Sequence, residues 1–118
     1  MAETMSEKYK IAPPGFTDEQ WETFMRDGFL TVEGALSPDE VQIYLDAIDR
    51  VVEVRGDFDG KKGYGPHHIV SLDPAFTELI DHPRHVGFGY DIYGEQTKLH
   101  GSNFLLRPRD SNVNIWHH

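Results

Sequence analysis

The sequence predicts an α+β fold in which a helical N-terminal part is followed by strands only near the end of the chain. Two helix-start motifs, at Thr17 and at Ser37, each precede apolar residues at helical spacing. From Leu99 onward the composition instead becomes strand-like, and residues 113–117 follow the period of two that is typical of strands. We therefore expect a layer of helices that packs against the first strands of a sheet.

The overall composition is that of a folded globular domain and argues against several kinds of partner. The 118 residues include 20 acidic and 11 basic side chains, which gives a net charge of -9. This charge repels phosphate backbones and anionic lipids, so we expect no nucleic-acid or membrane partner. The chain has no cysteine, so any metal must be bound by nitrogen or oxygen. Without a signal-like or membrane-spanning stretch the sequence predicts a cytoplasmic protein, and it does not indicate the oligomeric state.

The first predicted helix follows a flexible lead-in, residues 1–15, which ends in a Pro-Pro-Gly run that cannot continue a helix. Thr17 and Gln20 have the spacing of a capping box, in which each side chain binds the backbone amide of the other residue. Gly28 is placed to end this helix in the left-handed conformation. Residues 29–32 then predict a short strand.

The clearest helix start in the chain is at Ser37, because Pro38 occupies the first helical position and Glu40 the acidic position of a capping box. The predicted helix covers residues 38–54. Its apolar residues form one stripe over three turns: Val41, Tyr44, Leu45, Ile48, Val51 and Val52. A helix with such a stripe should lie on a core.

A long exposed loop is predicted for residues 56–68, which are rich in glycine. Loops of this kind often lie over active sites, although a plain connector is an equally good interpretation. Asp73-Pro74 and His82-Pro83 each have the form of a helix start, and the two short helices should end near Asp81 and at Gly94.

The final part of the chain predicts strands. Residues 99–106 have strand-like composition, and residues 108–112 have the composition of a turn. Val113, Ile115 and His117 then alternate with polar or larger residues, as in a second strand.

Histidines are the first candidates for metal ligands. The chain contains seven of them: His67, His68, His82, His85, His100, His117 and His118. His82 and His85 lie one turn apart and would suit a surface chelate, but a capping role beside Pro83 is the favoured interpretation. The adjacent pair His67 and His68 lies in the predicted loop, where neighbouring side chains point apart and substrate contact is a minor possibility.

Short motifs follow one another in a fixed order over about 100 residues. They are residues 16–20, 24–32, 34–41, 48–49, 72–76, 79–83, 92–94, 107–108 and 116–118. In their order and spacing they resemble the phytanoyl-CoA dioxygenase family of Fe(II)- and 2-oxoglutarate-dependent oxygenases. The resemblance implies a double-stranded β-helix, or jelly roll, with helices packed on one face.

The resemblance also implies a cofactor site. Members of the family carry a Trp-His-any-Asp motif whose His and Asp bind iron, and the strand period of two places both on one face. His117 matches the histidine of this motif, and His118 matches the variable residue. Asn103, Arg107 and Trp116 match positions near the cosubstrate 2-oxoglutarate, with Arg107 in place of the family's lysine.

The motif stops before its acidic ligand. We therefore expect residues 16–118 to be the N-terminal portion of a dioxygenase domain that hydroxylates a small organic or acyl substrate, truncated and inactive alone. A non-catalytic remnant that binds a protein partner through the 38–54 helix is the alternative. A third possibility is that the terminal His-His pair begins a purification tag.

Overall fold

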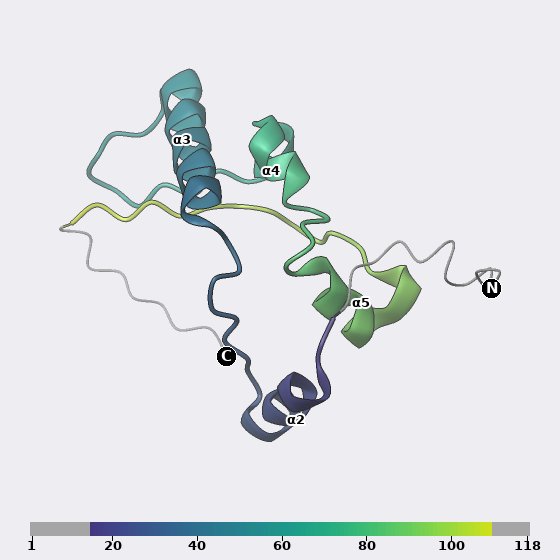
Figure 1. Cartoon of the computed structure of the whole chain (residues 1–118). Coiled ribbons are helices and arrows are strands. Elements are labelled where there is room, and N and C mark those ends of the chain that lie inside the picture. The colour runs from purple at the N-terminus through teal and green to yellow at the C-terminus, as the bar shows by residue number, and fades with distance from the viewer. Residues whose placement is uncertain (1–14, 110–118) are drawn as a thin grey trace. The chain divides into compact units, whose positions relative to one another are not determined.

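A computed structural model describes residues 15–109, and these contain four α-helices and no β-strand (Figure 1). The helices are α2 (Asp18–Asp27), α3 (Pro38–Arg55), α4 (Pro74–Glu78) and α5 (Val86–Tyr93), with short 3-10 turns at Ile69–Ser71 and Gly94–Gln96. The described residues divide into two compact units. One lies within Met1–Val41 and Ile80–Lys98, and the other within Gln42–Leu79 and Leu99–His118.

Helix α2 begins and ends where the sequence predicts. The Thr17 hydroxyl accepts a hydrogen bond from the Gln20 amide at 3.2 Å, and the Gln20 side chain accepts one from the Thr17 amide at 2.9 Å. Gly28 ends the helix with φ at 79°, and its N–H donates to the Phe24 carbonyl at 2.8 Å. The capping box and the glycine cap are both confirmed.

An aromatic cluster centred on Phe16 joins α2 to α5 within the first unit. The ring of Phe16 lies 5.3 Å from that of Trp21 and 4.7 Å from that of Phe88. The Phe16 amide also donates to the Asp91 carboxylate at 2.9 Å. A side chain at Gly15 would collide with that carboxylate, so the close approach of the chain to α5 requires glycine at this position.

Helix α3 begins at Pro38, and its start confirms the second capping box. The Glu40 amide donates to the Ser37 hydroxyl at 3.1 Å, and the Ser37 amide donates to the Glu40 carboxylate at 2.8 Å. The predicted apolar stripe is covered only in part. Val51 is buried, whereas Val41 is 43% exposed and Leu45 49% exposed.

The core of the second unit forms where α3, the Ile69–Ser71 turn and α4 meet. Four hydrophobic residues are buried there: Ala47, Val51, Ile69 and Phe76. Partly buried residues surround them, namely Ile48, Val70, Ala75, Leu79 and Phe104. The core is therefore small and depends on how α4 is held against α3.

An ion pair between Arg50 and Asp73 provides this link. The Arg50 guanidinium donates to both carboxylate oxygens of Asp73, at 2.9 and 3.1 Å. Asp73 is only 8% exposed and also caps α4, because its carboxylate accepts from the Ala75 amide at 3.0 Å. The predicted helix start at Asp73-Pro74 is thus confirmed.

The predictions of an α+β fold and of a jelly roll are wrong for the described residues. Residues 29–32 and 99–106, expected to be strands, are irregular. A strand requires a continuous ladder to a neighbouring backbone, and strand-like composition cannot supply that partner. The expected strand at residues 113–117 lies outside the described range.

The boundaries of the last two helices also differ from the prediction. Helix α4 ends at Glu78 instead of near Asp81, and α5 begins at Val86 instead of at Pro83. The His82 carbonyl accepts from the amides of His85 and Val86, which forms a turn before α5. Between residues 15 and 109, no helix is both long enough and apolar enough to cross a membrane.

Val51→Ala tests the contribution of the core on α3. We expect it to lower the free energy of unfolding by about 2 kcal/mol, because it removes two buried methyl groups and leaves a cavity. Val54→Ala is the matched control, because Val54 lies on the same helix but is 86% exposed. Its effect should stay within about 0.5 kcal/mol in urea titrations. Equal effects of the two substitutions would contradict this core.

The Asp73 ion pair predicts a loss of stability in acid. The pKa of Asp73 is lowered, first by the hydrogen bond from Arg50 and then by the Ala75 amide. When the pKa of a carboxyl group is lower in the folded than in the unfolded state, the charged carboxylate stabilises the fold. This stabilisation is complete above the pKa of the unfolded chain, about 3.9, and is lost as the pH falls through the pKa of the folded chain.

In urea titrations at pH 7 and pH 3 we expect Asp73→Asn to lose less stability on acidification than the unsubstituted chain. Asp49→Asn, which changes an exposed carboxylate on α3, should behave like the unsubstituted chain. An unchanged acid response in Asp73→Asn would show that the ion pair does not contribute.

Candidate functional site

The described residues contain part of the predicted site. Trp116 and His117, the predicted cosubstrate neighbour and iron ligand, lie outside residues 15–109, as does His118. Their roles therefore stay predictions. Asn103 and Arg107 are described, and both are exposed in the extended segment after the Gly94–Gln96 turn.

This extended segment runs alongside the glycine-rich loop that follows α3 (Figure 1). Tyr64 and Leu106 exchange two backbone hydrogen bonds, at 2.9 and 2.7 Å. A second antiparallel bridge pairs His67 with Asn103. The loop is thus held against the segment that carries Asn103 and Arg107.

One side of the extended segment is anchored in the core. The ring of Phe104 lies 6.1 Å from that of Phe76 and 6.4 Å from that of Tyr64. Burial alternates along residues 101–109, with even-numbered residues half-buried and odd-numbered residues exposed. Alternation of this kind is typical of an extended backbone, although no strand forms here. Asn103 and Arg107 therefore lie on the same, exposed side.

Side-chain interactions also order the beginning of the loop. The Tyr64 hydroxyl donates to the Asp57 carboxylate at 2.6 Å, and Arg55 lies 3.5 Å from the same carboxyl group. The hydrogen bond from Tyr64 lowers the pKa of Asp57, and Asp57 in turn raises the pKa of Tyr64. The Asp59 carboxylate accepts from two successive backbone amides, those of Lys61 and Lys62.

His82 has a structural role in the first unit and is not part of a chelate with His85. Its Nδ1 atom accepts a hydrogen bond from the Arg84 amide at 3.1 Å, so the ring proton lies on Nε2. Nε2 then donates to the Glu40 carboxylate at 3.0 Å. The pKa of Glu40 is lowered, first by the Ser37 amide and then by His82. His82 thus stabilises the turn before α5 and does not cap the helix, whose N-cap is His85 without a side-chain hydrogen bond. The partner Glu40 was missed.

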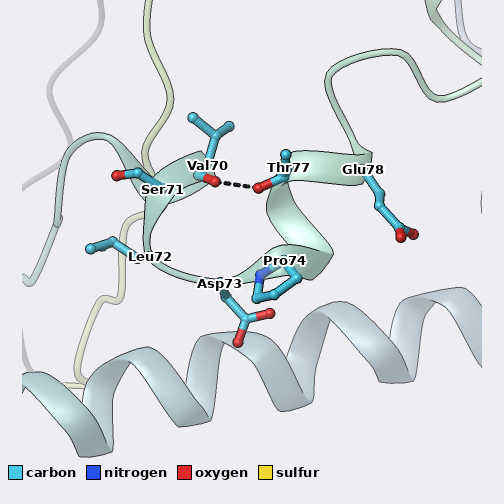
Figure 2. A pocket seen from close by; sticks show the side chains of 7 residues that line it. All are labelled: Val70, Ser71, Leu72, Asp73, Pro74, Thr77 and Glu78. Atoms are coloured by element: carbon cyan, nitrogen blue, oxygen red, sulfur yellow. Dashed lines mark hydrogen bonds between the residues drawn. The ribbon is translucent and has the colours of Figure 1, made fainter.

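An open pocket of about 370 Å³ lies beside α4 (Figure 2). Its lining is Val70, Ser71, Leu72, Asp73, Pro74, Thr77 and Glu78. Figure 2 shows the Thr77 hydroxyl directed at the Val70 carbonyl, to which it donates, and the Asp73 carboxylate directed toward α3. The polar groups of Thr77 and Asp73 are therefore bound within the protein.

An iron site requires at least three convergent protein ligands. The residues that the structure describes contain no group of three or more His, Asp or Glu side chains able to hold a metal. They do not fit an iron centre by themselves, so no chemical step through iron is assigned to them. What they do contain is a set of hydrogen-bond donors on one exposed side of the paired segments.

Comparisons with known proteins extend this picture. No protein-family model matches the chain, and no solved structure matches it. The chain is similar to a protein described as ectoine dioxygenase from Nocardia farcinica (strain IFM 10152), with 25% identity over 109 residues. The similarity covers 85% of this chain and 37% of that relative. The chain thus resembles a dioxygenase, and it spans little more than a third of the length of that relative.

The hydrogen-bonding pattern of His82 predicts its tautomer. Long-range ¹H–¹⁵N spectra at a pH at which the ring is neutral should show a proton on Nε2 alone, because Nδ1 accepts from the Arg84 amide. His100, which is exposed, serves as the reference for an unconstrained ring. A proton on Nδ1 of His82, or a mixture like that of His100, would contradict the described contacts.

Proposed function

We propose that this chain is the N-terminal portion of an Fe(II)- and 2-oxoglutarate-dependent dioxygenase domain that hydroxylates a small organic or acyl substrate. The observation that carries the proposal is the similarity to an ectoine dioxygenase, which extends over 85% of the chain. The ordered motifs that resemble the phytanoyl-CoA dioxygenase family also support it, because they include the Trp-His pair of an iron-binding motif.

In this proposal each part of the chain has a defined task. His117 supplies one imidazole ligand to iron, and the other ligands come from residues beyond this sequence. Asn103 and Arg107 bind 2-oxoglutarate through an amide and a guanidinium, which donate to carboxylate oxygens. Their common exposed side supports this assignment. Phe104 packs on Phe76 and keeps the segment in place.

The class of substrate is inferred from the similar protein alone. The similar protein from Nocardia is named for ectoine, so ectoine is the first substrate to test. The proposal also includes other small organic or acyl compounds as substrates, since similarity of sequence does not determine the substrate.

The coding sequence on the 3′ side of the His118 codon tests the proposal directly. We expect an acidic residue next, because the family's motif places its carboxylate two positions after the histidine, and a histidine and an arginine further on. An immediate stop codon, or a continuation without these residues, would contradict the proposal.

Activity provides the second test. The longer gene product, with Fe(II), 2-oxoglutarate and oxygen, should release succinate, whereas the 118-residue chain should release none above background. His117→Ala in the longer product should lower the rate more than about 100-fold, because even outer-shell partners of metal ligands contribute about 10- to 100-fold. His118→Ala is the matched control and should retain activity. Equal activity of the two variants would exclude His117 as a ligand.

A non-catalytic interaction domain is the second candidate function. Exposed apolar residues on α3 favour it: Val41 and Leu45 lie one helical turn apart, and apolar surface on a helix commonly marks a binding site. The 3′ coding sequence separates the two functions, because an interaction domain has no need of the remaining iron ligands.

A further inference from the structure

The two paired segments share a single register. The bridges Tyr64–Leu106 and His67–Asn103 are antiparallel, and the hydrogen bond from the His68 amide to the Ser102 carbonyl, at 2.8 Å, continues the same alignment. Residues that lie directly opposite each other in an antiparallel pair have their side chains on the same face. His67 therefore shares a face with Asn103.

The loop contributes few side chains to this exposed face. In the common register, Gly65 lies opposite Leu105 and Gly63 opposite Arg107. A Cβ atom added at Gly65 would lie 3.5 Å from a methyl group of Leu105, so the Leu105 side chain extends over the glycine. Along residues 63–67, only His67 adds a side chain beside Asn103, Leu105 and Arg107.

The chemistry of this face suits an anionic ligand. A neutral imidazole, a carboxamide and a guanidinium can each donate a hydrogen bond to a carboxylate oxygen. His67 and Asn103 form a non-hydrogen-bonded pair, in which the Cα atoms lie about 4.5 Å apart, so both side chains can reach one carboxylate. The acidic residues of the loop do not compete, since Asp57 is bound by Tyr64 and Asp59 by backbone amides.

We propose that His67 is a further binding residue of the site, and that together with Asn103 it binds a carboxylate group of 2-oxoglutarate. The inference rests on the proposed function and extends it, because the sequence motifs assign no role to His67. The loop thereby acts as one wall of the cosubstrate site, held in place by backbone pairing and by the Phe104 anchor.

The test is a titration of the ¹⁵N-labelled 118-residue chain with 2-oxoglutarate alone, followed by amide chemical shifts. We expect shifts in residues 64–65, 67–68 and 102–107, and a dissociation constant about tenfold higher in His67→Ala, the effect of one lost hydrogen bond to a charged group. His67→Gln should recover much of the affinity, because its amide retains a donor. Acetate at the same concentrations controls for unspecific carboxylate binding.

His68→Asn is the matched control. His68 is also an exposed histidine, but it has a left-handed backbone conformation with φ at 58°, which asparagine tolerates, and it should bind 2-oxoglutarate like the unsubstituted chain. Unchanged shifts outside the loop would show that each variant is folded.

The outcomes separate this inference from the proposed function. If Asn103→Ala weakens the binding of 2-oxoglutarate and His67→Ala does not, the role of His67 is overturned and the dioxygenase proposal is unaffected. No binding, or equal shifts with acetate, also overturns the inference. The dioxygenase proposal itself is decided by the 3′ coding sequence and by succinate release from the longer product, neither of which depends on His67.

Discussion

The ion pair between Arg50 and Asp73 is the interaction on which the second unit depends. A carboxylate with 8% exposure is costly to bury unless its oxygens are bound. Asp73 meets this requirement only while Arg50 donates to both oxygens and the Ala75 amide donates to one of them. The same contacts hold α4 against α3 and start α4, so one side chain positions a helix and also caps it.

The position of the candidate site depends on this ion pair. With α4 in place, Phe76 is buried against Val51, and the ring of Phe104 can pack beside it. Phe104 in turn places its neighbours Asn103 and Leu105 on the opposite, exposed side. Backbone hydrogen bonds then add the loop to this segment. The geometry of the cosubstrate candidates is thus a consequence of core packing.

Sequence patterns predicted the local structure well where the interacting groups are close in the chain. The capping boxes at Thr17 and Ser37 join residues that are three positions apart, so their hydrogen bonds can be predicted from the sequence. The strands expected at residues 29–32 and 99–106 were predicted wrongly, because strand-like composition describes an extended conformation but not its neighbours. The link between His82 and Glu40 was missed for a related reason, since 42 residues separate them.

By itself, the sequence determined where α2 and α3 begin and that the chain contains no cysteine. These features depend on the covalent order of residues and on the period of the helix. Only the tertiary structure decided that His67 lies beside Asn103 and that Asp73 binds Arg50. Such contacts join distant residues, and they form only where core packing brings two stretches of backbone together.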